Sequence, residues 1–300
     1  MWTWFSAHKR TLPWRDLSDS DDRLRGYKIL VSEVMLQQTQ VSRVVRAYVE
    51  FLSIFPTVDH LASASNAEVI IAWSGMGYNS RALRLRDAAR VISQSDGFPK
   101  TYESLITING IGPYTAGAIL NFAFRIPTPC IDTNIRKILW SAFYRKEPAP
   151  PKDKALLTLA SEVLSAALET GASRGFDTAD WHAALMDLGS IAFKKTTDRQ
   201  SLTVMKQWFP VRNLTIVATV KKPEPGRRVG SSFIPRRIFR GRIVEALRKH
   251  PAGLSHASLG ERIASDWQPD RHAEWLTALC DTLIQEGIVD RSGSVYRLRS

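Results

Sequence analysis

The chain has 300 residues, 44% of them hydrophobic, which fits a folded protein of one large domain or two. Lys and Arg outnumber Asp and Glu by 41 to 29, and this net charge of +12 favours polyanionic partners such as nucleic acids. The two cysteines, Cys130 and Cys280, exclude a four-cysteine iron–sulfur site or a zinc knuckle, and the absence of an apolar run near ~20 residues predicts a soluble cytoplasmic protein with no membrane association.

Helical periodicity dominates the first two thirds of the chain. In residues 27–55 the apolar positions recur at helical spacing until Pro56, which predicts one helix. The fold class expected from the whole pattern is mainly α. Further helices are expected over residues 59–64, 67–73, 81–93, 102–108, 135–144, 154–168 and 179–193.

The last third of the chain predicts a small separate domain. Alternating β-branched residues over 214–220 indicate one strand, and a basic stretch rich in Gly and Pro indicates a linker over 211–237. Three helical segments then precede two short strands, which is the order of a winged helix. We therefore expect a first domain over 1–210 and a winged-helix-like domain over 238–300.

A turn with two glycines, Gly110 and Gly112, separates two apolar segments. Glycine permits tight turns and close approach of the backbone to another group. A helix that begins near Pro113 would offer free N–H groups to an anion, for which a nucleic-acid phosphate is the natural candidate. An ordinary corner between two helices without a ligand remains the alternative.

Two carboxylates stand out as candidates for acid–base chemistry. Glu33 lies within an apolar run, where burial would raise its pKa and let it act as an acid near neutral pH; the alternative is a position on the wet face of a helix. Asp132 precedes a helical run, which suits a helix N-cap, or else an ionised carboxylate held at a helix start. One protonated and one charged carboxyl could together cleave a glycosidic bond.

Three further polar residues allow either a structural or a binding interpretation. Gln37 and Gln38 follow Glu33 and suit either solvated helix surface or amide side chains that fill the gap left by an extruded nucleotide. Tyr114 follows the glycine turn and suits either a core position or a base pocket.

Six segments spread over roughly residues 1–193 form a recognisable series: LPWR (12–15), SEVMLQQT (32–39), WSGMGY (73–78), GIGPYTAGA (110–118), IDTN (131–134) and MDLG (186–189). Together they resemble the helix–hairpin–helix DNA glycosylases related to endonuclease III, and within them the MutY-type adenine glycosylases. The SEVMLQQT stretch is the part specific to adenine glycosylases.

The resemblance implies a role for each matching residue. Glu33 would protonate the adenine ring and help to activate water, and Asp132 would stabilise the oxocarbenium-like state or bond to it. Tyr114 and Asn134 would line the catalytic pocket. The recognition residues implied are Gln38 as the wedge in the duplex, with Gln37 beside it, Tyr78 near the opposite base, and Gly110 and Gly112 in the hairpin that grips a phosphate.

Position 114 predicts the type of reaction, and three other features of the sequence depart from the family pattern. Position 114 is Tyr rather than the Lys that bifunctional relatives use as a nucleophile, which predicts a monofunctional glycosylase. No cysteine follows the MDLG segment, so no 4Fe–4S cluster is expected, with Phe193 and nearby basic residues in its place. The winged-helix-like domain stands in place of the family's Nudix-like C-terminal domain. The family's Gly-Tyr-Tyr motif is also changed, to Gly77-Tyr78-Asn79. These two differences put recognition of the base opposite the adenine in question.

We therefore expect a monomeric glycosylase that acts on double-stranded DNA and removes adenine mispaired with guanine or 8-oxoguanine. Two alternatives stay open at this stage: a glycosylase for thymine or uracil opposite guanine, which keeps the fold, and a DNA-binding protein without catalytic activity. The presence of both carboxylates disfavours the second.

Overall fold

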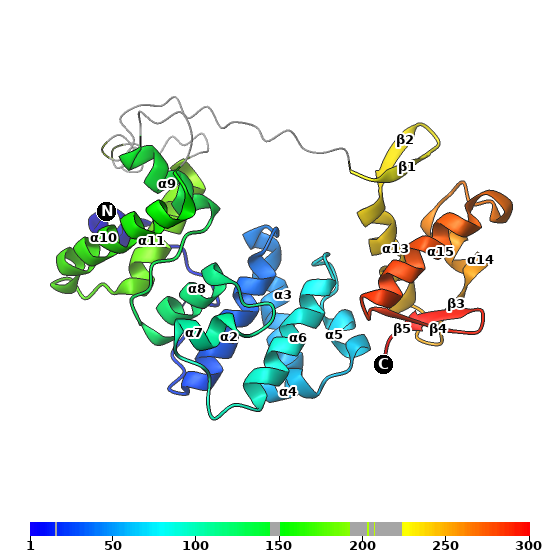
Figure 1. Ribbon diagram of the computed structural model, residues 1–300, viewed down its shortest axis with the longest axis horizontal. Coiled ribbons are helices and arrows are strands. Elements are labelled where there is room, and N and C mark those ends of the chain that lie inside the picture. The colour runs from blue at the N-terminus through cyan, green and yellow to red at the C-terminus, as the bar shows by residue number, and fades with distance from the viewer. Residues whose placement is uncertain (16, 145–150, 193–202, 204–206, 208–223) are drawn as a thin grey trace. The chain divides into compact units, whose positions relative to one another are not determined.

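The computed structural model describes residues 1–300 except 16, 145–150, 193–202, 204–206 and 208–223 (Figure 1). The described part is mainly helical, with short strands between residues 226 and 298, which confirms the predicted fold class. The predicted strand over 214–220, the predicted linker up to residue 223 and Phe193 lie outside the described residues.

The described chain divides into two compact units. The first contains residues 1–33 and 94–217, and the second contains residues 34–93 and 218–300. Helix α2 crosses from one to the other at Glu33. The division into domains at 1–210, 211–237 and 238–300 stays a prediction.

The first unit holds most of the helices that surround the catalytic candidates. Its large apolar core joins the N-terminal helix to α9, α10 and α11, and Trp2 stacks on Phe176 with ring centroids 4.6 Å apart. Figure 1 shows α9, α10 and α11 packed side by side. The helices are α1 (Trp2–His8), α2 (Asp22–Leu36), α7 (Tyr102–Ile106), α8 (Pro113–Phe124), α9 (Thr133–Phe143), α10 (Asp153–Ala172) and α11 (Thr178–Ala192).

Helix α10 is long and apolar enough, by length and composition alone, to cross a membrane. Its residues Leu156, Ala160, Leu164 and Ala167 are buried in the core of the first unit. These contacts pack one face of α10 against the rest of the first unit.

The second unit combines four helices of the N-terminal half with the C-terminal module. The helices α4 and α6 pack together, as do α5 and α6. They are α3 (Val41–Ile54), α4 (Val58–Ser63), α5 (Asn66–Ala72) and α6 (Ser80–Ser93).

The C-terminal module has the element order of a winged helix. A three-stranded antiparallel sheet in the order β3-β5-β4 packs with three helices, and Val289 pairs with Leu298 at one end of the final hairpin. The elements are α13 (Arg236–Arg248), β3 (Leu254–Ser255), α14 (His256–Ile263), α15 (Pro269–Gln285), β4 (Val289–Ser292) and β5 (Val295–Leu298).

The module contacts the rest of the second unit through hydrogen bonds to backbone carbonyls. The Arg248 guanidinium donates from Nε and Nη2 to the carbonyl oxygen of Ile70 at 3.1 and 2.8 Å. Asn66 Nδ2 donates to the carbonyl oxygen of Gly287 at 2.6 Å. These bonds join α5 and its C-terminal end to α13 and to the turn before β4.

Two predictions about elements were wrong. Residues 27–55 form two helices rather than one, because the chain breaks at residues 37–40, where Gln38 adopts a left-handed conformation with φ of 55°. Helical spacing of apolar residues continues through the break, so periodicity alone did not detect it. Residues 226–235, within the predicted linker, form a hairpin of β1 (Gly226–Val229) and β2 (Ser232–Pro235).

Candidate active site

Glu33 lies on α2, one turn before the helix ends, with its carboxyl group buried. The residue is 6% exposed, and its pKa is raised from 4.5 to about 7. Burial is the largest cause and the negative charge of Asp132 adds to it, while a hydrogen bond from the Tyr114 hydroxyl and the positive charge of Arg15 act in the opposite direction. Of the two interpretations of Glu33, the buried one is therefore correct, and the carboxyl can hold its proton near neutral pH.

Asp132 is the N-cap of α9 and is half-buried. Its Oδ1 accepts a hydrogen bond from the Ile135 amide at 2.6 Å, and its Oδ2 accepts one from Asn134 Nδ2 at 3.2 Å. Burial raises the pKa of Asp132, and these hydrogen bonds, with the charge of Lys137, oppose that rise. The residue is therefore both a helix cap and a carboxylate whose charge acts on Glu33, so the two interpretations are compatible.

Tyr114 lies in the first turn of α8, immediately after the glycine turn, and its hydroxyl bonds to Glu33. Burial raises the pKa of Tyr114 well above its usual value, and the charge of Glu33 adds to the effect. The phenol thus keeps its proton and serves as a donor rather than as a nucleophile.

A buried amide fixes the irregular segment that leads to Asp132. Asn121 Nδ2 donates to the carbonyl oxygens of Gly117 and Thr128, both at 2.7 Å, and Asn121 Oδ1 accepts from the Thr128 amide at 3.1 Å. The Thr178 hydroxyl also donates to Asn121 Oδ1 at 2.5 Å. We did not predict this role, although a single Asn inside the apolar run of α8 was a visible signal.

A buried ion pair connects the N-terminal segment to α11. Two nitrogens of the Arg15 guanidinium contact the two carboxylate oxygens of Asp187 at 2.7 and 2.8 Å, and Arg10 also binds this carboxylate. The side chains of Arg15 and Asp187 are 7% and 2% exposed. Both residues lie in segments that carry the family resemblance, but their pairing across 172 positions was not evident from sequence.

The hairpin between α7 and α8 exposes its two glycines. Gly110 has a φ of 95°, where glycine is favoured, whereas Gly112 has an ordinary φ of −88° and caps α8. A Cβ atom built on Gly112 would meet no heavy atom within 4 Å. Nothing in the described part of the chain therefore requires glycine at position 112, and the free space lies at a helix N-terminus, where an anion is favoured.

The residues expected to enter the duplex lie on two loops of the second unit. Gln37 and Gln38 follow α2 and are exposed, and Tyr78, which is 50% exposed, precedes α6. Gln38 and Tyr78 both have left-handed backbone conformations, with φ of 55° and 46°. L-residues adopt such conformations at a cost in energy, so the surrounding structure must enforce them.

Arg81 binds both loops and was not predicted. Its buried guanidinium donates to the carbonyl oxygens of Val34 at 2.9 Å, Gln37 at 2.5 Å and Met76 at 3.2 Å. It also lies 5.5 Å from the centre of the Tyr78 ring. Burial lowers the pKa of Arg81 to about 10, so the side chain remains charged at neutral pH.

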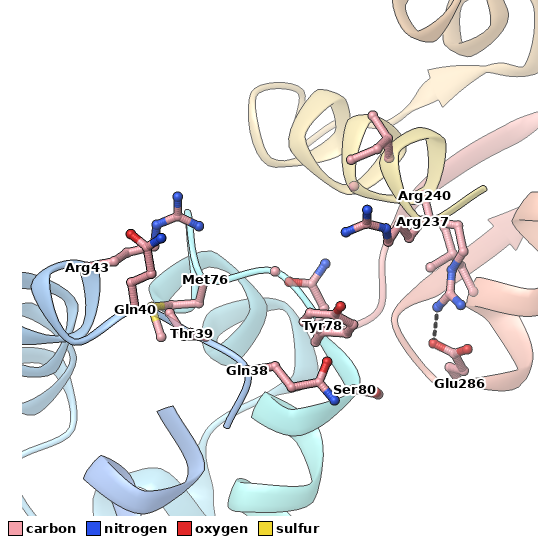
Figure 2. A pocket seen from close by; sticks show the side chains of 15 residues that line it. Gln38, Thr39, Gln40, Arg43, Met76, Tyr78, Ser80, Arg237, Arg240 and Glu286 are labelled. Atoms are coloured by element: carbon pink, nitrogen blue, oxygen red, sulfur yellow. Dashed lines mark hydrogen bonds and ion pairs between the residues drawn. The ribbon is translucent and has the colours of Figure 1, made fainter. Parts of the chain in front are cut away.

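These two loops line a pocket of about 590 Å³ together with α13 and the end of α15, all within the second unit (Figure 2). Gln38 and Tyr78 contribute from the loops, and Arg237, Arg240 and Glu286 contribute from the C-terminal module. A cavity of this size whose lining includes Arg43, Arg237 and Arg240 can accept part of a nucleic acid.

The donor groups of the chain do not fit a cluster held by four thiolates. Cys130 and Cys280 are the two cysteines of the sequence, both are buried and free, and burial raises the pKa of each, that of Cys280 to about 12. Among the described residues, no group of three or more His, Cys, Asp or Glu side chains could hold a metal ion. The prediction that no 4Fe–4S cluster is bound stays a prediction.

The structure thus places the predicted residues in two groups. Glu33, Tyr114, Asp132 and Asn134 interact with one another in the first unit. The second group, on loops of the second unit, contains Gln37, Gln38 and Tyr78. The roles of these residues remain proposals, considered below.

Comparisons with known proteins show which family the chain is similar to. The family described as HhH-GPD superfamily base excision DNA repair protein matches residues 31–163. The adenine DNA glycosylase of Mycobacterium tuberculosis (strain CDC 1551 / Oshkosh) is 32% identical over 295 residues, which cover 96% of this chain and 90% of the relative. That of Mycolicibacterium smegmatis is 31% identical over 299 residues, which cover 97% and 91%. The structure of a thermostable thymine-DNA glycosylase has the same fold, with a TM-score of 0.57 at 22% identity over 69% of this chain and 90% of that one.

Proposed function

We propose that this chain, which belongs to the adenine DNA glycosylase family within the HhH-GPD superfamily, hydrolyses the N-glycosidic bond of adenine mispaired with guanine or 8-oxoguanine in double-stranded DNA. The abasic site that remains would be the substrate of later steps of base excision repair. The decisive observation is a buried Glu33 whose pKa is about 7, within the electrostatic reach of a hydrogen-bonded Asp132.

Each carboxyl has a separate role in this reaction. Protonated Glu33 donates its proton to a ring nitrogen of adenine while the bond from C1′ to the base breaks and its electron pair leaves with the base. The Asp132 carboxylate, stabilised by the N-terminus of α9, offsets the positive charge that develops on the sugar. Water then adds to C1′, and ionised Glu33 accepts the proton that the water loses.

The pocket residues support hydrolysis rather than strand cleavage. Tyr114 carries a phenol rather than an amine, so it cannot form a covalent Schiff-base intermediate, and its hydroxyl hydrogen-bonds to Glu33 instead. Asn134 donates to Asp132 and so orients the carboxylate. The phenol at position 114 supports a monofunctional enzyme.

The remaining features support DNA as the substrate. The net charge of +12 favours phosphate binding, and the open space at Gly112 leaves the N-terminus of α8 accessible to a backbone phosphate. Gln38, with Gln37 beside it, and Tyr78 are exposed on loops from which they could enter the duplex and occupy the space of the extruded nucleotide. We infer a monomer that acts in the cytoplasm on the chromosome, without an iron–sulfur cluster.

The test is a panel of duplexes with adenine opposite guanine, 8-oxoguanine, cytosine or thymine, and with thymine or uracil opposite guanine. Alkali-labile sites should form at adenine opposite guanine or 8-oxoguanine. Glu33→Gln should slow the single-turnover rate by about 10³-fold or more, since it removes the acid. The control is Glu50→Gln, the same change at an exposed glutamate, which should keep the full rate.

Release of thymine or uracil but not of adenine would contradict the proposed substrate and support the alternative, a glycosylase for thymine or uracil opposite guanine. No base release from any duplex at high enzyme concentration would refute a glycosylase.

A further inference from the structure

The segment that joins α8 to Asp132 has no regular secondary structure. Residues 125–132 form neither helix nor strand, and Pro127 and Pro129 within them have no N–H group to donate. The segment nevertheless ends at a carboxylate of the proposed reaction. The position of Asp132 therefore depends on the tertiary contacts that hold residues 125–131 in place.

The buried amide of Asn121 binds the middle of this segment. Its Nδ2 donates to the carbonyl oxygen of Thr128 at 2.7 Å, and its Oδ1 accepts from the Thr128 amide at 3.1 Å. The side chain thus pairs with both backbone groups of one residue, as a neighbouring strand would. Because a backbone N–H can only donate, the bond to Thr128 also fixes which end of the amide is the oxygen.

The same amide bonds to α8 and to the start of α11. Asn121 Nδ2 donates to the carbonyl oxygen of Gly117 at 2.7 Å, and Asn121 Oδ1 accepts from the Thr178 hydroxyl at 2.5 Å. Asn121 is 0% exposed and Thr178 is 1% exposed, so water does not compete for these bonds. Removal of this amide would leave buried backbone groups of Thr128 unpaired.

Glycines on two helices let those helices approach the segment closely. A Cβ atom on Gly117 of α8 would lie 2.6 Å from the Cβ of Cys130, and one on Gly189 of α11 would lie 2.7 Å from the Cβ of Asn134. Asp132 is midway between Cys130 and Asn134 in the chain. The helices α8 and α11 therefore both pack closely beside Asp132, and the bond between Asn121 and Thr178 joins these two helices.

We propose that Asn121 and Thr178 are positioning residues, which hold residues 125–131 so that the Asp132 carboxylate stays beside the Glu33 carboxyl. Both act through Asp132 rather than on the DNA. The inference rests on the proposed function, since that function gives Asp132 its role in the reaction. A displacement of about 1 Å in a reacting group can lower a rate about 100-fold, so a small shift of the segment matters.

The first experiment uses Cys130 as a probe of the segment. Cys130 is 2% exposed, so iodoacetamide reaches its thiol only when the segment opens. Cys280 in the second unit is 0% exposed and reports global unfolding, and peptide mass spectrometry separates the two alkylation rates. Asn121→Leu, which keeps a similar shape without hydrogen-bonding groups, should speed alkylation of Cys130 about tenfold or more and leave Cys280 unchanged.

The second experiment measures adenine release at saturating concentrations of the full-length protein. Asn121→Leu should lower the single-turnover rate about 100-fold, while affinity for the duplex changes by less than about twofold. Thr178→Val removes the hydroxyl with little change of shape and should show both effects more weakly, whereas Thr178→Ser keeps the hydroxyl and should behave as wild type. The control is Ser141→Ala, which removes a buried hydroxyl of α9 bonded to the Lys137 carbonyl and should change neither quantity.

The pH dependence distinguishes positioning from a loss of stability. Burial and the charge of Asp132 raise the pKa of Glu33, whereas Tyr114 and Arg15, which also face it, act in the opposite direction. Cys130 faces Glu33 as an uncharged thiol, since its own pKa is raised. If Asp132 moves away and water enters, the pKa of Glu33 should fall. The decrease of the rate with rising pH should then begin at lower pH than in the wild-type protein.

The outcomes also separate this inference from the proposed function. If Asn121→Leu speeds alkylation of Cys280 as well, the variant is unfolded and Thr178→Val decides. An unchanged Cys130 rate in the folded variants, or a wild-type rate and pH profile despite faster alkylation of Cys130, would overturn the positioning role.

If the wild-type protein releases no adenine, the proposed function fails, and two readouts without substrate remain. These are the alkylation of Cys130 and the titration of Glu33 by ¹³C NMR, with the signal assigned by its loss in Glu33→Gln. In Asn121→Leu the Glu33 signal should titrate at lower pH than in the wild-type protein. Titration at the same pH would show that the segment does not hold Asp132 beside Glu33.

Discussion

The carboxyl site of the first unit and the pocket of the second unit differ in how far their polar groups are exposed to water. In the first unit, Glu33 is almost fully removed from water, and the loss of solvation raises its pKa to about 7. In the second unit, Arg237 and Tyr78 stay exposed at a pocket with donors and acceptors on both walls. Acid catalysis near neutral pH needs a carboxyl group that is buried away from water, whereas binding of DNA needs charged side chains that are exposed to solvent. The two requirements are met in separate parts of the chain.

Each region also depends on one buried arginine. Arg15 pairs with Asp187 and its charge acts on Glu33, and Arg81 binds the backbone of the two loops at the pocket. A carboxylate neutralises the first arginine, whereas backbone carbonyl oxygens accept hydrogen bonds from the two terminal nitrogens of the second. The first arrangement is expected to be more sensitive to the loss of its partner, because a lone buried charge remains.

The largest effect on stability should follow Asp187→Asn. This change leaves the Arg15 guanidinium buried without its counter-charge and should lower the free energy of unfolding by about 3–5 kcal/mol in urea denaturation. The control is Asp153→Asn, which breaks the exposed pair with Arg136 at 2.8 Å and should cost less than about 1 kcal/mol. Equal losses in the two variants would show that the Arg15 pair is not an essential part of the core.

Next is the pH dependence that Glu33 introduces. In the folded protein it keeps its proton up to about pH 7, whereas in the unfolded chain it ionises near 4.5. The folded state therefore binds more protons between these values, and stability falls as pH rises through this window. Glu33→Gln, which cannot ionise, should exceed the wild-type protein in stability by about 3 kcal/mol at about pH 8 and match it near pH 4.5.

The catalytic rate should follow the same ionisation. Adenine release by the wild-type protein should decrease as pH rises above about 7, because Glu33 loses its proton. A rate that rises through this range, or a stability difference that does not vary with pH, would contradict a proton held on Glu33.

A smaller effect is expected at the pocket from Arg81→Lys. Lysine keeps the charge but cannot reach the carbonyl oxygens of both loops, so we expect a loss of about 2 kcal/mol in unfolding free energy and slower adenine release. Arg84→Lys on the same helix changes an exposed arginine bonded only to Ser80 among the described contacts, and it should be neutral. Identical behaviour of the two variants would rule out Arg81 as the residue that positions the loops.

The smallest effect should come from Gly112→Ser. Serine is a good N-cap, and a Cβ at this position meets nothing within 4 Å, so stability should hold or rise slightly. Affinity for duplex DNA should nevertheless fall by about 1 kcal/mol, because the side chain occupies the space left for a phosphate. Gly117→Ala is the contrast: its Cβ would lie 2.6 Å from that of Cys130, so it should destabilise the fold. Unchanged DNA affinity in Gly112→Ser would exclude the proposed phosphate contact.

Sequence alone predicted the helical fold class, the glycine turn, and Glu33 and Asp132 as the two candidate carboxylates. These depend on local properties: the spacing of apolar residues, the conformational freedom of glycine and the preference of aspartate for a helix start. The adenine-glycosylase resemblance added the roles of Glu33, Tyr114 and Asp132, which remain to be tested by mutation.

Tertiary structure alone decided the environment of those residues. Burial of Glu33, the pairing of Arg15 with Asp187 and the binding of two loops by Arg81 each join residues far apart in sequence. The break between α2 and α3 at Gln38 could not be predicted from the sequence. The helical spacing of apolar residues continues across it, and the left-handed conformation of Gln38 is stabilised by tertiary contacts of the loop. A pKa depends on how much water and which charges surround a group, and no local pattern in the chain specifies either.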